Sequence, residues 1–162
     1  AVSVALLRSG RPVLGVTFDP TEEEVFYAEK GKGAFLNGVE LPIHDEPRAM
    51  RECVAQVDLK RLPENLSSAL GRRPPYSSQR NFGAATLEWC YVAAGRFHLY
   101  LHGGQRLWDY AAGTIILEEA GGHMCTLTHD EFWSEPAWTK SVIATLDPAL
   151  FSEWRRWIRE RL

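Results

Sequence analysis

The sequence predicts an α/β protein, with an antiparallel β-meander followed by a mainly parallel sheet with helices. Two observations support this prediction. Within 1–50, short segments of alternating apolar and polar residues are separated by turn residues, the pattern of a half-buried antiparallel sheet. Within 51–162, short apolar segments alternate with helical segments, which is typical of a parallel sheet covered by helices. We therefore expect a meander at 1–50, as the remainder of an N-terminal subdomain, and a C-terminal α/β subdomain at 51–162.

In the first half, alternating segments predict strands at 2–7, 12–18 and 25–29. A shorter pair of strands flanks Asn37-Gly38, the strongest hairpin signal of the chain, because a type I′ turn needs positive φ at both positions. The chain opens at Ala1 without a methionine and enters a strand pattern at once. We therefore expect that the sequence lacks its natural beginning.

Glycines, prolines and apolar runs divide the second half into further elements. The expected elements are a strand at 53–57, a helix at 63–70, a strand at 76–80, a helix at 84–94, a strand at 97–101, a helix within 107–122 with Asp109 near its start, strands at 124–127 and 141–145, and a helix at 148–162. In the last helix, Leu150, Trp154 and Ile158 fall on one face, opposite arginines. This stripe also suits a membrane-surface helix, but its ordinary length and mixed charge favour packing against the core.

The composition excludes several classes of function. The chain has 162 residues, 45% of them hydrophobic, which is enough to bury one core. Its 18 basic and 21 acidic residues give a net charge of −3, so the charge offers no signature of a nucleic-acid partner. No apolar run approaches the ~20 residues of a membrane helix. The three cysteines are widely spaced, which argues against a disulfide framework or a zinc site and favours a cytoplasmic location.

The helix that begins at Asp109 is marked at both ends. Asp109 stands where backbone N–H groups lack partners and where the helix dipole favours an anion. Gly121 ends the helix, because glycine readily takes the left-handed conformation. Ala111 and Gly113 leave the first turn almost without bulk, so another backbone segment or a ligand can approach the carboxylate. From spacing alone, Asp109 is either a simple N-cap or a functional carboxylate.

Around this helix the sequence resembles a known family. Residues 108–113, followed by Ile116 and residues 119–122, are similar to the C-terminal signature of the inositol monophosphatase family of metal-dependent phosphatases. Residues 28–38 are similar to a hairpin in the middle of that family's chain. The resemblance implies a layered α-β-α-β-α sandwich of the sugar-phosphatase type. It also implies Mg²⁺ as the cofactor and Asp109 as a metal ligand and catalytic residue beside the scissile phosphate.

The same resemblance implies a substrate-binding surface. Residues 80–97 resemble the helix that faces the substrate in the family, where the helix start presents backbone N–H groups to an anion. Tight packing of these small residues on the sheet is the alternative interpretation. At the position of His102 the family often carries a Glu that accepts hydrogen bonds from the sugar ring. The replacement of this Glu by His bears on whether inositol is the preferred substrate, and it leaves the phosphatase chemistry in place. The substrate-binding residues implied in this way are Gly83, Ala84, Ala85, His102 and Asp109.

Other metal ligands of the family are absent from this sequence. They are a Glu-Glu pair and an Asp-Pro-x-Asp-Gly-Thr motif. Asp19-Pro20 begins like the second motif, but residues 21–23 supply neither the second Asp nor the Gly-Thr, so we do not assign Asp19 to a metal. The chain thus corresponds to the C-terminal portion of a family member.

These observations predict a Mg²⁺-dependent phosphomonoesterase that acts on inositol monophosphate or a related small sugar phosphate through a metal-activated water. The expected partners are a small phosphorylated substrate and, as is usual in the family, a second copy of the chain, with no nucleic acid and no membrane. One alternative is a non-catalytic scaffold or subunit-interface domain that keeps the fold without a complete metal site. Another is the same chemistry on a sugar bisphosphate or a nucleotide 3′-phosphate.

Overall fold

The computed structural model describes residues 1–43, 46–134 and 138–162. Its first half is an antiparallel meander in which each strand pairs with the next one along the chain. The strands are β1 (Val2–Arg8), β2 (Arg11–Asp19), β3 (Glu24–Glu29), β4 (Ala34–Leu36) and β5 (Val39–Glu40). Asn37 and Gly38 have φ values of 48° and 85°, which confirms the predicted hairpin turn between β4 and β5.

The second half contains a mixed sheet with the strand order β7-β6-β8-β10-β9. Its strands are β6 (Val54–Asp58), β7 (Ser78–Arg80), β8 (Leu99–Arg106), β9 (His123–Cys125) and β10 (Thr139–Thr145). β6 runs parallel to β7 and β8, whereas β10 lies antiparallel between β8 and β9. Among the described strands of this sheet, β10 therefore runs in the direction opposite to the other four. Its apolar sequence fits a buried strand of either direction, which is why sequence alone did not reveal the reversal.

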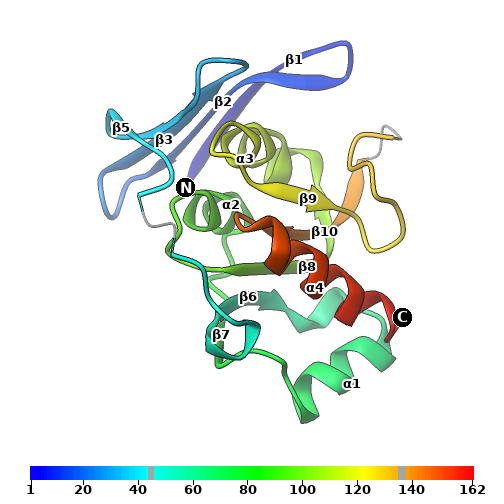
Figure 1. The fold of residues 1–162 in the computed structure, drawn as a ribbon. Helices are drawn as coiled ribbons and strands as arrows, with labels where there is room; N and C mark the ends of the chain where they lie inside the picture. Colours follow the sequence, from blue (N-terminus) through cyan, green and yellow to red (C-terminus); the bar gives the residue numbers. More distant parts are fainter. Residues whose placement is uncertain (44–45, 135–137) are drawn as a thin grey trace.

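The helices form two layers. They are α1 (Glu64–Arg72), α2 (Ala85–Ala93), α3 (Leu107–Glu119) and α4 (Pro148–Arg159), accompanied by the short 3₁₀ turns η1 (Met50–Glu52) and η2 (Leu59–Arg61). α2 and α3 lie between the meander and the second sheet, and α1 and α4 pack on the other face of that sheet (Figure 1). The described residues thus stack as β-α-β-α, which confirms the layered α/β sandwich. α4 buries Leu150, Trp154 and Ile158 against the sheet, so its apolar stripe serves packing.

Small residues allow α3 to approach its neighbours closely. A Cβ placed on Gly113 would lie 2.4 Å from the Trp89 Cβ of α2, and one placed on Gly15 of β2 would lie 2.8 Å from the carbonyl oxygen of Ala112. Neither position has room for a methyl group without displacement of its neighbours. The small residues in the first turns of α3 therefore pack against other parts of the protein. This packing fixes α3 against both α2 and the meander.

One hydrophobic cluster joins the two halves of the chain. It contains Phe26 of β3, Trp89 of α2, Tyr100 of β8 and Ile116 of α3, all of them fully or almost fully buried. The chain passes from the meander to the second sheet near residue 50. Because the core extends across that point, the division into subdomains at 1–50 and 51–162 remains a proposal.

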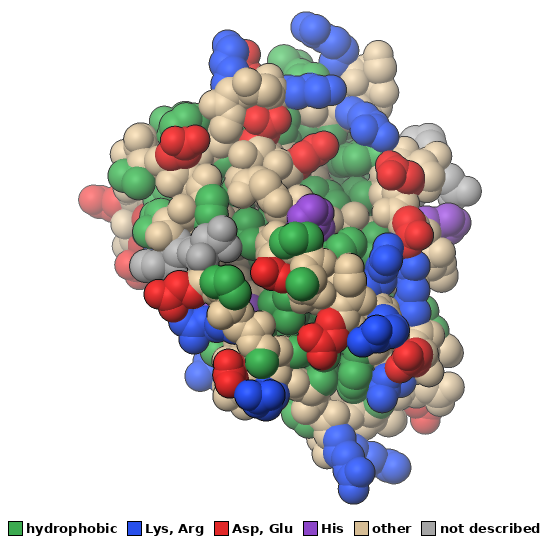
Figure 2. All heavy atoms as spheres, in the orientation of Figure 1, with side chains coloured by type: hydrophobic (Ala, Val, Ile, Leu, Met, Phe, Trp, Pro, Cys, Tyr) green, Lys and Arg blue, Asp and Glu red, His purple; other side chains and the backbone are tan. Residues whose placement is uncertain are grey.

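The surface combines mixed charge with one apolar face. Figure 2 shows acidic and basic side chains interspersed over the face in view, without one dominant patch of either sign. The outer face of the meander exposes Val2, Val4 and Leu6, each to more than half of its full extent. In the part of the chain that the structure describes, no helix has the length and apolar character needed to cross a bilayer.

Candidate functional site

A polar cavity of about 210 Å³ lies at the carboxyl ends of β6 and β8, beside the N-terminal ends of α2 and α3. In α/β proteins this end of the strands is the usual place for a ligand. The lining residues are Asp58, Arg61, Asn81, Gly83, Ala85, Glu88, His102, Gly104, Arg106 and Asp109. The cavity brings together Gly83, Ala85, His102 and Asp109 from the set implied by the sequence. Ala84 precedes α2 and does not line the cavity.

Asp109 combines a structural contact with a position in the cavity. α3 begins at Leu107 with Arg106 as its N-cap, so Asp109 lies in the first turn as its third residue and is not the N-cap itself. The Oδ2 atom of Asp109 accepts a hydrogen bond from the backbone N–H of Arg106 at 2.9 Å. Among the described residues, no hydrogen bond occupies the other carboxylate oxygen. The two interpretations left open by the sequence, a cap and a functional carboxylate, are therefore compatible.

His102 forms a pair with Asp58. The two residues are direct partners in the parallel register of β6 and β8, so their side chains project from the same face of the sheet. The Nε2 atom of His102 lies 3.3 Å from Oδ2 of Asp58. The Nδ1 atom of His102 accepts a hydrogen bond from the backbone N–H of Gly104 at 3.0 Å. Burial lowers the pKa of His102, against the opposing attraction of Asp58, which favours a neutral ring at neutral pH.

The segment before α2 shapes another wall of the cavity. Gly83 has a φ of 67°, in the left-handed region, and its N–H donates to the side-chain oxygen of Asn81 at 2.8 Å. The Gly83 N–H, expected to face a substrate, is therefore engaged within the turn. Ala85 begins α2 and lines the cavity, so the helix start itself faces this space.

Glu88 is a buried acid at the cavity wall that the sequence did not indicate. Its side chain is 3% exposed, and Oε1 accepts a hydrogen bond from the backbone N–H of Phe82 at 3.1 Å. Burial raises the pKa of Glu88, and the hydrogen bonds from Phe82 and Tyr100 oppose this shift. Tyr100 also contacts Gln105, whose side-chain oxygen accepts a hydrogen bond from Trp89 Nε1 at 2.8 Å. Glu88 thus belongs to a buried polar network that lies behind the wall of the cavity.

The cavity residues can contribute to a metal site but do not complete one. Mg²⁺ prefers several oxygen ligands, of which carboxylates commonly supply one or two. Asp109 offers a carboxylate oxygen of the right kind. Among the described residues, however, no three His, Cys, Asp or Glu side chains are grouped so that they could hold a metal ion. Each oxygen of the Asp58 carboxylate has one partner within the protein, the His102 ring and the Lys60 N–H.

Several cavity residues lacked a local sequence signal. Asp58, Arg61 and Arg106 were not singled out, although Asp58 directly follows a predicted buried strand. An acidic residue at the carboxyl end of a parallel strand is a signal that could have identified it. Glu88 lies within the helix expected at 84–94, whose start the sequence predicts either to face the substrate or to pack on the sheet. Glu88 itself was not singled out from the sequence, and it is held by the Phe82 N–H from the segment before α2.

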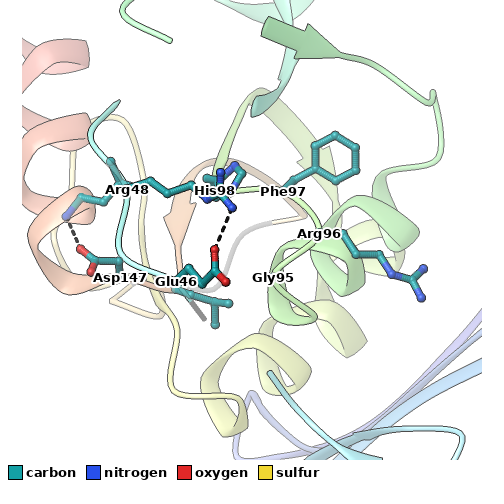
Figure 3. A pocket seen from close by; sticks show the side chains of 9 residues that line it. Glu46, Arg48, Gly95, Arg96, Phe97, His98 and Asp147 are labelled. Carbon is teal, nitrogen blue, oxygen red and sulfur yellow. Dashed lines mark hydrogen bonds and ion pairs between the residues drawn. The ribbon is translucent and has the colours of Figure 1, made fainter. Parts of the chain in front are cut away.

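A second and larger cavity, of about 470 Å³, contains no residue implied by the sequence analysis (Figure 3). Its polar side chains have structural partners. His98 Nδ1 accepts a hydrogen bond from Val54 N–H at 3.0 Å, and Asp147 caps α4 through the Leu150 N–H at 2.6 Å. Figure 3 shows the Arg96 side chain pointing away from the cavity, where it pairs with Glu24. The smaller cavity with Asp109 is therefore the candidate site.

Asp19 has a structural role as well. Its Oδ1 atom accepts a hydrogen bond from Thr21 N–H at 2.9 Å, and Oδ2 accepts one from the Tyr91 hydroxyl at 3.1 Å. These contacts, that of Thr21 above all, hold the pKa of Asp19 below its usual range. The arrangement agrees with leaving Asp19 out of the metal ligands.

The layered sandwich and the polar cavity at the strand ends define a protein with the fold of the sugar phosphatases. The model of the inositol monophosphatase family matches residues 1–156, and the chain belongs to this family.

Individual relatives agree with this assignment. The chain is 29% identical to Nus factor SuhB of Pasteurella multocida over 169 residues, which covers 96% of this chain and 63% of the relative. It is 32% identical to inositol-1-monophosphatase of Caulobacter vibrioides over 151 residues, which covers 90% of this chain and 58% of the relative. The crystal structure of extragenic suppressor protein suhB from Bartonella henselae matches with a TM-score of 0.83 and 30% identity, over 99% of this chain and 61% of that one. The chain thus spans between 58% and 63% of these relatives.

Proposed function

We propose that the protein carrying this chain is a Mg²⁺-dependent phosphatase that hydrolyses inositol monophosphate or a related small sugar phosphate. The observation that carries the proposal is the Asp109 carboxylate in a polar cavity beside the start of α2, in a chain of the inositol monophosphatase family. The name of the Caulobacter vibrioides relative, inositol-1-monophosphatase, supports the same activity.

In this proposal each part of the cavity has a distinct task. Asp109 is a ligand of the metal and lies beside the phosphate, while the start of α2, where Ala85 lines the cavity, favours the phosphate's negative charge. His102 lies on the side of the sugar ring. Mg²⁺, when bound, would supply an activated water and stabilise the charge of the leaving oxygen. The family motifs that would supply its remaining ligands are absent from this sequence.

A single substitution tests this proposal. The Asp109→Asn variant keeps a side-chain oxygen that can accept the Arg106 N–H, so α3 should fold normally. We expect the protein as it occurs in the cell to lose Mg²⁺-dependent phosphate release by about 100-fold or more with this variant. Glu118→Gln, an exposed change on the same helix, is the matched control. A wild-type rate in the Asp109→Asn variant would remove Asp109 from the proposed machinery.

As a second candidate function we propose a non-catalytic scaffold or subunit-interface domain. Some relatives carry the name Nus factor SuhB, which is the name of those proteins and not a measured property of this one. We further propose a cytoplasmic homodimer. A panel of inositol monophosphate, a sugar bisphosphate and a nucleotide 3′-phosphate, each with and without EDTA, distinguishes the candidates. EDTA-sensitive release of phosphate supports the enzyme, and no release from any substrate supports the scaffold.

A further inference from the structure

We infer that Asp58 is a specificity-determining residue of this cavity. Its carboxylate accepts hydrogen bonds from hydroxyl groups of a polyol phosphate, and His102 acts as a positioning residue that holds it. The inference rests on the proposed function, because it names the group that recognises the sugar part of the substrate.

The strand register fixes the pair in space. Asp58 is the last residue of β6 and lies directly opposite His102 of β8. Both side chains line the cavity, at 17% exposure for Asp58 and 9% for His102. Because rigid neighbouring strands carry both side chains, their relative placement does not depend on a loop.

The hydrogen bonds of His102 determine which ring nitrogen carries the proton. The backbone N–H of Gly104 can only donate, so Nδ1 must act as the acceptor. In a neutral imidazole the proton then resides on Nε2, which faces Oδ2 of Asp58 at 3.3 Å. Both ring nitrogens of His102 are therefore used within the protein. His102 has no nitrogen left for a substrate hydroxyl.

Asp58 retains acceptor capacity, whereas Asp109 is assigned to the metal in the proposed function. Oδ1 accepts one hydrogen bond from the Lys60 N–H at 2.9 Å, and Oδ2 faces His102, whereas an ionised carboxylate can accept about four. The side-chain oxygen of Asn81 is engaged by Gly83, and Glu88 is buried. Asp58 is thus the carboxylate best placed to accept from hydroxyl groups on this side of the cavity.

The test compares two substrates in the protein as it occurs in the cell. Inositol 1-phosphate offers ring hydroxyls, whereas 4-nitrophenyl phosphate offers none. We expect Asp58→Asn, which keeps an oxygen for the Lys60 N–H, to raise KM for inositol 1-phosphate by about tenfold with little change in kcat. KM for 4-nitrophenyl phosphate should stay within about twofold. An equal change for both substrates, or no change for either, would overturn the inference. Glu153→Gln, an exposed acid on α4, is the control.

Two isosteric variants test the role of His102. The amide nitrogen of Gln matches Nε2 and can still donate to Asp58, whereas Asn matches Nδ1 and leaves Asp58 without this donor. We expect His102→Asn to raise KM for inositol 1-phosphate as Asp58→Asn does, and His102→Gln to raise it much less. Equal effects of the two variants would remove His102 as a positioning residue.

A binding measurement separates this inference from the proposed function. If the wild-type protein hydrolyses neither substrate, the proposed phosphatase activity fails. Calorimetric titration with inositol 1-phosphate then decides the inference by itself. Binding that Asp58→Asn weakens by about tenfold supports it. Absence of binding to the wild type, or equal binding by the variant, overturns it.

Discussion

The carboxylate of Glu119, at the end of α3, accepts a hydrogen bond from the backbone N–H of Gly33 in the loop between β3 and β4, at 2.9 Å. Its other oxygen accepts one from the N–H of Gly31 at 2.8 Å. A single side chain thus joins the helix that carries Asp109 to the meander. Both N–H groups belong to glycines with positive φ, at 76° and 85°, so the loop holds a conformation that suits these contacts.

Loss of this contact should destabilise the fold. We expect Glu119→Ala to lower the free energy of unfolding by about 1–3 kcal/mol, since two hydrogen bonds to a charged acceptor disappear. Glu119→Gln should lie between this variant and the wild type, because one amide oxygen remains as acceptor. Urea denaturation measures the difference, and Glu118→Ala, exposed on the same helix, serves as the control. Equal stability of the Glu118 and Glu119 variants would contradict the prediction.

Gly113 should tolerate no side chain. A Cβ at this position would lie 2.4 Å from the Trp89 Cβ, so Gly113→Ala must push α3 away from α2. We expect a loss of about 1–3 kcal/mol in the free energy of unfolding, as is typical of overpacking. Gly71→Ala in α1 is the matched comparison, since no atom lies within 4 Å of its added Cβ. That variant should gain about 0.5–1 kcal/mol from helix propensity, and a loss there would contradict this argument.

The contribution of Asp19 to the free energy of unfolding should decrease at acidic pH. The hydrogen bond from the Thr21 N–H, together with that from Tyr91, lowers the pKa of Asp19 in the folded protein. The unfolded chain therefore takes up the proton first as pH falls. The contribution is fully present above the unfolded pKa and is lost as pH falls through the folded value. We expect Asp19→Asn to be less stable than the wild type at pH 7 and nearer to it at pH 3, by thermal denaturation at both pH values.

Glu88 should show the opposite dependence. Burial raises its pKa in the folded protein, so the unfolded chain releases this proton at a lower pH than the folded one does. Stability is then highest below the unfolded pKa and falls as pH rises toward the folded value. Because Gln at this position can still accept from Phe82, we expect Glu88→Gln to gain stability relative to the wild type between pH 4 and pH 7. A stability difference that does not change over this range would show that the folded pKa of Glu88 is not raised.

The elements that the sequence predicted well are those with strong local signals. Asn37-Gly38 forms its expected turn, and Gly121, with a φ of 84°, ends α3 as predicted. By contrast, the strand expected at 97–101 extends as β8 to Arg106, because pairing with β10 continues along residues 102–106. This pairing joins segments more than thirty positions apart in the chain, and no local pattern encodes it.

In the candidate site, too, the residues with strong local signals were the ones that the sequence predicted. Asp109 stood out because it lies in a long, specific motif next to a helix start. Asp58 did not, because it meets His102 only through the pairing of β6 with β8, which are distant in the chain. Glu88 did not, because its burial and its contact with the Phe82 N–H depend on how the chain turns into α2. His102 was recognised as the departure from the family pattern, but its partner becomes visible only from the register of the two strands.

That register has an evolutionary consequence. A relative with Glu at the position of His102 would set two acids side by side if it also kept the acid at position 58, and like charges at this distance repel. The two positions are therefore expected to covary among homologues, with a switch at one permitted only after compensation at the other. Placing either residue alone in a relative should lower the stability of that relative, whereas exchanging both together should preserve it.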